Sequence, residues 1–388
     1  MISVDEALAH LFALTSPVGT ERVSLSQASG RVLATDAIAT RDQPQFSASA
    51  MDGYAVTGPV STGASYRVVG ESAAGAAFSG QLTKGDAVRI FTGAPVPAGC
   101  DTVIIQENVS RDGAQITVTD AASGSNIRPA GGDFRIGQSL KSPRRLSPND
   151  VALLAAMNIP LVDVSRKPEV ALISTGNELV MPGETPGPDQ IIASNTFGLK
   201  ALLEGIGANV RILPIARDNA ASLEQAFGLS DGADLIVTIG GASVGDHDLV
   251  GQVAQQLGMQ QRFYKIAMRP GKPLMAGRMG DAMMVGLPGN PVSAMVCGQV
   301  FLRPVIDAMQ GLPKQKRLPL TATLAQAVAK NGPREHYMRA IVQSQKLTAF
   351  ERQDSSLLTV LADANALLIR PPHDPAQPAG AQIQYLPI

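Results

Sequence analysis

The chain has 388 residues, of which 45% are apolar and 17% are charged, and its 32 Lys and Arg nearly balance 33 Asp and Glu. At about 100–200 residues per domain, this length and composition predict two to four globular domains and exclude a disordered chain. A net charge of −1 excludes a broadly basic surface, so we expect no nucleic-acid partner.

The first residues lack the pattern of a signal peptide. No basic stretch precedes the first apolar residues, and Asp5 and Glu6 come early. No run approaches the roughly 18 apolar residues of a membrane span. Cys100 and Cys297 have no metal-ligand spacing and suit a reducing compartment. We therefore expect a cytoplasmic protein with no membrane partner.

Two capping boxes predict helix starts in the first half of the chain. Ser3 pairs with Glu6, and Ser147 pairs with Asp150 in the same spacing. The predicted helices span residues 3–13 and 147–157. Between them, short alternating runs separated by Gly, Pro and Asp turns predict a β-rich module over residues 37–128.

After residue 167 the pattern alternates between buried strands and helices. Its apolar runs show no polar alternation, which indicates a parallel sheet buried on both faces. We therefore predict a doubly wound α/β domain over residues 167–311. The predicted strands are 170–175, 211–216, 233–241, 261–268 and 281–287, and the predicted helices are 194–203, 222–229, 248–257 and 291–309. Residues 312–388 return to short strands and Pro-rich turns, which predict a small β barrel or sandwich.

Acidic and Gly-rich residues follow the predicted strands of the α/β domain. Glu178 and Asp218 follow two strands, and the loops 240–246 and 288–291 follow two others. Because the carboxyl ends of parallel strands meet at one edge, we expect these residues to lie together. The loops carry three glycines for close backbone approach, a hydroxyl, and a proline that begins a helix: Gly240, Gly241, Gly245, Ser243 and Pro291. The pattern is neither a Walker A loop nor a dinucleotide GxGxxG, and one such loop alone is an ordinary turn.

Three cationic side chains are expected near these acids. Lys265, Arg269 and Lys272 lie in one short span that leads into a Pro-Gly turn, and such a cluster suits phosphate or another oxyanion. Carboxylates beside phosphates suggest Mg²⁺, with Asp246 and Asp248 as further acids. Ion pairs that face solvent remain the alternative.

The first half of the chain carries its own acids. Asp52 lies in a stretch of small residues, and Asp133 follows Arg128 and two glycines. Each alone is an ordinary turn, because Asp and Gly are common turn residues. Spacing does not connect them with the α/β domain.

Seven strings in this order closely resemble one family, the molybdopterin molybdenumtransferases of the MoeA type, which includes the E domain of gephyrin. The strings are SASAMDGYAV, TGAPVPAGCDTVI, NIRPAGGDFRIG, STGNELV, TIGGASVGDHD, YKIAMRPGKP and GLPGNPVSA. The resemblance covers nearly the whole chain. It implies insertion of molybdenum from molybdate into adenylylated molybdopterin, with release of AMP and a requirement for Mg²⁺.

The resemblance also implies an architecture and partners. Its four domains would be a linking domain of residues 1–36 and 129–166, the β-rich module, a molybdopterin-adenylyltransferase-like α/β domain and a C-terminal barrel. An elongated homodimer would place each site in a cleft between the α/β domain of one subunit and the β-rich module of the other. A molybdopterin adenylyltransferase would supply the substrate.

Carried over residue by residue, the resemblance assigns catalytic roles to five acids and one lysine: Asp52, Asp133, Glu178, Asp218, Asp248 and Lys265. It assigns substrate binding to Thr92, Arg128, Gly240, Gly241, Ser243, Gly245, Arg269, Lys272, Pro288, Pro291, Arg339 and Ser355. Asp246 or Asp248 would hold the metal.

Three residues depart from the family pattern. Arg269 stands where many members carry Lys. The planar guanidinium fork of Arg therefore replaces the single ammonium group of Lys. Asp246 stands in place of Glu, and Asp354 in place of Gly beside Ser355. None removes an assigned acid.

Other functions remain open at this point. The α/β domain could adenylylate molybdopterin, and a tungstate-preferring paralogue would have much the same sequence. The chain could also be a non-catalytic pterin-binding or scaffolding member of the fold, or an unrelated anion-binding enzyme such as a sugar-phosphate isomerase.

Overall fold

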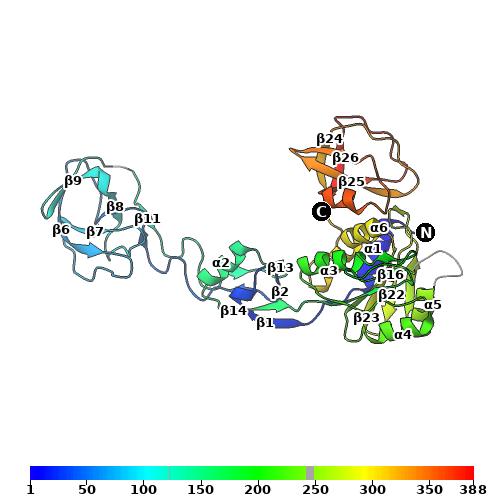
Figure 1. The fold of residues 1–388 in the computed structure, drawn as a ribbon. Coiled ribbons are helices and arrows are strands. Elements are labelled where there is room, and N and C mark those ends of the chain that lie inside the picture. The colour runs from blue at the N-terminus through cyan, green and yellow to red at the C-terminus, as the bar shows by residue number, and fades with distance from the viewer. Residues whose placement is uncertain (122, 242–248) are drawn as a thin grey trace.

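The computed structural model describes residues 1–121, 123–241 and 249–388. The chain is elongated (Figure 1): a β-rich module lies at one end, a small linking region follows, and the α/β domain with the C-terminal β domain forms the other end. This arrangement confirms the predicted class of a doubly wound α/β domain combined with β modules.

The distal module is a six-stranded sheet in the order β8-β5-β7-β6-β10-β9. Its strands are β5 (Gly53–Val56), β6 (Ser65–Ser72), β7 (Asp86–Ile90), β8 (Thr102–Ile105), β9 (Val109–Asp112) and β10 (Gln115–Val118). A short pair, β4 (Ala48–Ser49) with β11 (Ile127–Arg128), lies beside it. Buried Val, Ile and Ala on both faces of β5 and β7 hold this module together.

The linking region contains a four-stranded sheet and one helix. The sheet order is β1-β14-β2-β13, and a further pair joins β3 with β12. The strands are β1 (Thr20–Ser24), β2 (Val32–Leu33), β3 (Ala37–Ile38), β12 (Ser139–Leu140), β13 (Arg144–Arg145) and β14 (Leu161–Ser165). Helix α2 (Pro148–Ala156) begins with the predicted capping box of Ser147 and Asp150.

The α/β sheet has the order β18-β15-β19-β23-β22-β20. Its strands are β15 (Glu169–Ser174), β18 (Asn209–Ile212), β19 (Leu235–Ile239), β20 (Gln260–Tyr264), β22 (Met275–Met279) and β23 (Ala282–Leu287). The first four in the order are parallel, whereas β22 is antiparallel to both β23 and β20. The predicted strands are therefore all parallel to one another, and the sheet is mixed only because β22, which was not predicted, returns antiparallel between β23 and β20. A separate pair joins β16 (Leu179–Val180) with β17 (Ile191–Ile192).

Helices cover both faces of this sheet. Buried residues of α4 (Ala220–Gly228) and α5 (Leu249–Gln256) pack on one face. On the other face lie α3 (Asn195–Gly205), α6 (Pro291–Cys297), a π-helical turn (Gly298–Leu302) and α7 (Arg303–Met309).

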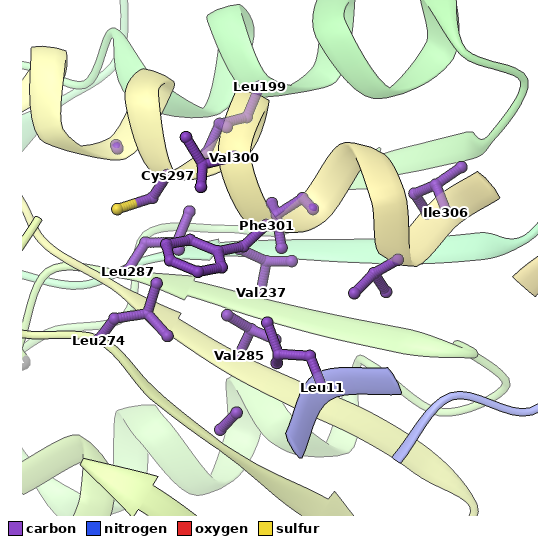
Figure 2. Close-up of a cluster of buried hydrophobic side chains, with 14 of the residues drawn as sticks. Leu11, Leu199, Val237, Leu274, Val285, Leu287, Cys297, Val300, Phe301 and Ile306 are labelled. Atoms are coloured by element: carbon purple, nitrogen blue, oxygen red, sulfur yellow. The ribbon is translucent and has the colours of Figure 1, made fainter. Parts of the chain in front are cut away.

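The N-terminal helix α1 (Val4–Leu14) joins this second core. Leu11 of α1 lies beside Val285 of β23, and Phe301 lies at the centre of the same buried cluster (Figure 2). The predicted capping box of Ser3 and Glu6 begins the helix.

One described helix, the continuous stretch Pro291–Met309, is long and apolar enough to cross a membrane. Most of it, 78%, is buried inside the protein, as in the core helix of an α/β domain. Its apolar surface is therefore accounted for by packing on the sheet.

The C-terminal region is a closed five-stranded barrel. Strands β25, β26, β24, β28 and β27 follow one another, and β27 pairs back with β25. The strands are β24 (Leu320–Leu324), β25 (Glu335–Gln343), β26 (Lys346–Ala349), β27 (Ala366–Arg370) and β28 (Gln382–Pro387), and a short helix is α8 (Leu358–Asp363). A two-residue strand, β21 (Met268–Arg269), leaves the α/β domain and pairs with β25. The barrel is therefore joined directly to the chain segment that carries the predicted cations.

Candidate functional site

The carboxyl edge of the α/β sheet gathers several predicted loops. Strands β15, β19 and β23 are parallel, so Thr175, Gly240 and Pro288 leave the sheet at the same edge. Strand β20 runs in that direction too, which brings Lys265 to the same edge.

Two acidic loops at this edge are locked to each other. The Asn177 amide N–H donates to Asp218 Oδ2 at 3.1 Å, and the Asp218 N–H donates to Asn177 Oδ1 at 3.1 Å. Arg217 Nη1 donates to the carbonyl oxygens of Asn177 and Leu179 at 3.1 and 3.0 Å. This network fixes the backbone beside Glu178. Asn177 and Arg217 were missed from the sequence, although each adjoins a predicted acid.

A pocket of about 420 Å³ opens at this edge, and we call it the central pocket. Its wall includes five predicted residues: Glu178, Gly240, Gly241, Pro288 and Pro291. Asn195, which the sequence analysis missed, donates from Nδ2 to the Gly289 carbonyl at 2.7 Å and holds the 288–291 loop in place.

The two described glycines of the 240–246 loop are required by geometry. Both have positive φ, 95° at Gly240 and 65° at Gly241. A Cβ atom on Gly240 would lie 2.7 Å from the Thr175 carbonyl oxygen, and one on Gly241 would lie 2.2 Å from Val250 Cγ2. Glycine is therefore required at both positions, because any side chain would be strained at these φ values and would meet Thr175 or Val250.

A second pocket, of about 290 Å³, adjoins the first, and we call it the cationic pocket. Arg269, Lys272 and Ser355 line it, together with Arg334, which the sequence analysis missed. The two pockets share three wall residues: Pro273, Pro288 and Asn290. A ligand with two separated anionic groups could therefore occupy both.

Arg339 lies behind the cationic pocket and is wholly buried. Its Nη2 donates to the Asp354 carbonyl at 2.9 Å, whereas Nε and Nη1 find no partner among the described residues. Burial, followed by the repulsion of Arg269, lowers the pKa of Arg339, and Asp354 opposes that shift. Buried guanidinium donors without acceptors are costly, so this site favours an incoming anion.

Gln353 ties the 351–356 loop to the barrel. Its Oε1 accepts the Arg339 N–H at 3.0 Å, and its Nε2 donates to the carbonyl oxygens of Arg339 and Phe350 at 2.9 and 2.7 Å. The Ser355 carbonyl accepts the Val292 N–H at 3.1 Å, which joins the loop to the start of α6. The Asp354 carboxylate is turned to Ser356, accepting from its N–H and its hydroxyl.

Lys265 lies at the same edge but does not line either pocket. Its backbone has φ 73°, its N–H donates to the Leu274 carbonyl, and its Nζ lies 5.0 Å from the centre of the Tyr264 ring. This left-handed residue ends β20, so the predicted strand 261–268 is divided between the α/β sheet and the barrel.

Three predicted residues, Asp52, Thr92 and Arg128, lie in or beside the distal module, and Asp133 adjoins Phe134, which packs against Met157 in the linking region. Thr92 donates from its N–H and its hydroxyl to Asp52 Oδ1, both at 2.7 Å. Arg128 lies on β11, and the Asp133 N–H donates to the Gln43 carbonyl at 2.9 Å. The distal module lies at the opposite end of the molecule from the α/β domain (Figure 1), so one chain does not bring the two groups together.

Four other predicted residues fall outside the described part of the chain: Ser243, Gly245, Asp246 and Asp248. Within residues 1–121, 123–241 and 249–388, no three His, Cys, Asp or Glu side chains converge to hold a metal ion.

Three family models together match most of the chain. They are the MoeA N-terminal region (domain I and II) over residues 2–158, a probable molybdopterin binding domain over 171–308, and the MoeA C-terminal region (domain IV) over 321–388.

Curated relatives and solved structures agree with these models. The chain is 38% identical to the molybdopterin molybdenumtransferase of Haemophilus influenzae, over 84% of this chain and 82% of that protein. It is 35% identical to molybdopterin molybdenumtransferase 2 of Mycobacterium tuberculosis over 93% of each. A crystal structure of a molybdopterin biosynthesis MoeA protein from Pyrococcus horikoshii superposes with a TM-score of 0.88 at 25% identity, covering all of both chains.

Proposed function

We infer the reaction of this chain from its family, because the chain belongs to the MoeA family of molybdopterin molybdenumtransferases. It is an enzyme of molybdenum cofactor biosynthesis that transfers molybdenum to molybdopterin. The finer proposal is that it takes molybdate and adenylylated molybdopterin as substrates and releases AMP with Mg²⁺.

The observation that carries this proposal is the pair of adjoining pockets. One is lined by Arg269 and Lys272, and two of its wall residues, Gln353 and Asp354, are hydrogen-bonded to the buried Arg339. The other is walled by glycine backbone and Glu178. A tetrahedral dianion and a phosphorylated pterin could therefore bind side by side, which metal transfer between them requires.

In the cationic pocket, Arg269, Lys272 and Arg339 would hold the molybdate dianion. Two guanidinium forks and one ammonium supply charge-assisted donors for its oxygens. The Ser355 hydroxyl at the rim would donate a further hydrogen bond. Arg339 is reached from the pocket only after its buried donors turn toward the ligand.

In the central pocket, the backbone at Gly240 and Gly241 would bind the pterin phosphate, between walls formed by Pro288 and Pro291. Ser243 and Gly245 continue this loop outside the described residues. Glu178 and Asp218 would orient water for hydrolysis of the phosphoanhydride. Lys265, at the same edge, would neutralise part of the charge of the leaving AMP.

The acids at this edge suit a hard cation such as Mg²⁺, since Glu178 offers carboxylate oxygens to the pocket that would hold the phosphates. Asp246 or Asp248 would hold the ion. When bound, Mg²⁺ would offset the negative charge of the pyrophosphate.

The residues Asp52, Thr92, Arg128 and Asp133 would complete the site of a second copy. A homodimer would bring the distal module of one subunit to the carboxyl edge of the other. A molybdopterin adenylyltransferase would be the donor of the adenylylated substrate.

The test is AMP release from adenylylated molybdopterin, measured with Mg²⁺ and with or without molybdate. We expect molybdate-stimulated release and a pterin product that activates a cofactor-free molybdoenzyme. Asp218→Asn and Asp248→Asn should still bind the pterin but lower release by about 10²–10³-fold, as loss of one catalytic group commonly does. Exposed Asp189→Asn is the matched control.

The outcomes separate the alternatives. Binding without release would indicate a non-catalytic or scaffolding member, and release stimulated by tungstate in place of molybdate would indicate a tungstate-preferring one. Normal AMP release by Asp218→Asn or Asp248→Asn would contradict the role given to that acid.

A further inference from the structure

Arg89, on β7 in the distal module, lies against two aromatic rings. Its guanidinium carbon is 5.1 Å from the centre of the Tyr54 ring and 4.7 Å from that of Phe91. Tyr54 is buried, whereas Arg89 and Phe91 are half-buried. Stacking on two rings fixes the plane of the guanidinium and so fixes where its N–H groups point.

Those N–H groups hold the backbone carbonyls of Asp52 and Gly53, one through Gln106 and the other directly. Arg89 Nη1 donates to the Gly53 carbonyl at 3.1 Å, and Nη2 donates to Gln106 Oε1 at 2.6 Å. The Gln106 N–H in turn donates to the Asp52 carbonyl at 3.0 Å. Both peptide groups that follow Asp52 and Gly53 are therefore tied, directly or through Gln106, to one guanidinium.

The Asp52 side chain is held by Thr92, two residues beyond the end of β7. Thr92, three residues after Arg89, donates twice to Asp52 Oδ1 at 2.7 Å. These hydrogen bonds are the main cause of the lowered pKa of Asp52; burial opposes them, and the charge of Arg89 makes a smaller contribution in the lowering direction. Glu107, which accepts a hydrogen bond from Gln106 Nε2 at 3.1 Å, is a further charged group beside Gln106.

We propose that Arg89 is a positioning residue for Asp52: its fork fixes the backbone that presents the carboxylate to Thr92. The proposal rests on the proposed function, in which Asp52 acts in the site of a second subunit. A purely structural role would consist only of the ring stacking and would stabilise the sheet without affecting Asp52.

Two replacements separate the fork from the charge. Arg89→Lys keeps the charge and removes the fork, whereas Arg89→Met removes both and keeps an apolar stem beside the rings. Arg67→Met is the matched control, because Arg67 lies on the neighbouring strand β6 and pairs with Asp86 instead. Each full-length variant is assayed for AMP release, giving kcat, KM and the pH profile, and for thermal unfolding.

Both Arg89 variants should lower kcat by about 10²-fold with KM unchanged, as a misplacement of about 1 Å does. The acid limb of the pH profile should move slightly to higher pH in Arg89→Met, because the charge of Arg89 contributes in a minor way to the lowered pKa of Asp52, but it should stay in place in Arg89→Lys. Arg67→Met should match the unmodified protein.

Two results would overturn the proposal. One is a loss of activity that only follows the fraction of unfolded protein, with an unchanged acid limb. The other is unmodified kcat and pH profile in both Arg89 variants while Asp52→Asn is inactive. Full activity of Asp52→Asn would instead contradict the role of Asp52 in the proposed function, whatever Arg89 does.

Discussion

His336 shows how burial changes the chemistry of one residue. It lies on β25, is only 7% exposed, and its Nε2 has no partner among the described residues. Burial lowers its pKa to about 4, with further repulsion from Arg269, Arg339, Arg370 and Arg334. The imidazole is therefore neutral at pH 7, in a strongly cationic part of the molecule.

The pH dependence of stability should report this histidine. The unfolded chain binds the proton below about pH 6.5, but the folded chain does not until about pH 4, so stability falls as pH falls through this range and the loss is complete near pH 4. The shift corresponds to roughly 3 kcal/mol at most. Urea unfolding between pH 7 and 4 should show a shallower decline in His336→Gln.

Exposed His373→Gln is the control for this prediction and should retain the profile of the unmodified protein. If His336→Gln loses stability with acid as steeply as the unmodified chain, the buried imidazole is not the group that titrates.

At the scale of elements, local sequence signals predicted the starts of two helices correctly, whereas the extent and pairing of several strands differ from the prediction. The capping boxes of α1 and α2 begin helices where the sequence places them. The run 261–268 instead divides at Lys265 into β20 and β21, which belong to different sheets. Strand β22 was not predicted, because Gly-flanked Met and Ala residues give no clear alternation. Residues 213–216, predicted as strand, lie beyond the end of β18, although the Leu213 N–H still donates to the Leu172 carbonyl and Ala216 forms a bridge with Thr175.

The capping box of α2 gives a prediction for the linking region. Asp150 is buried, its Oδ2 accepts the Ser147 N–H at 2.9 Å, and it pairs with Arg144 at 2.8 Å. Ser147→Ala should lower the free energy of unfolding by about 1 kcal/mol, since it leaves a helix N–H without its acceptor. Denaturant unfolding measures this loss, and exposed Asn149→Ala serves as the control. If both replacements lower the free energy of unfolding equally, the Ser147 cap makes no specific contribution to stability.

At the scale of the whole molecule, the elongated shape separates Asp52 from Glu178 within one chain (Figure 1). If each site is shared between two subunits, a mixture of Asp52→Asn and Glu178→Gln chains will contain dimers with one intact site. Mixed after partial unfolding and refolding, the two inactive variants should recover about a quarter of the unmodified activity, because half of the dimers are mixed and each has one intact site of two.

Refolding each variant alone is the control for this experiment and should give no recovery. An inactive mixture in which mixed dimers are demonstrably present would show that both residues act within one chain or that one of them has no role.

The sequence by itself determined the class of fold, the family, and the loops that follow the strands of the α/β sheet. Those features are local: hydrophobic periodicity, capping residues and glycine turns act within a few residues of the chain. Tertiary structure alone decided that Arg269 is tied to the barrel through β21, that Arg339 is buried with unpaired donors, and that the cationic and central pockets share a wall. These outcomes depend on which distant surfaces pack together, and no local pattern specifies that packing.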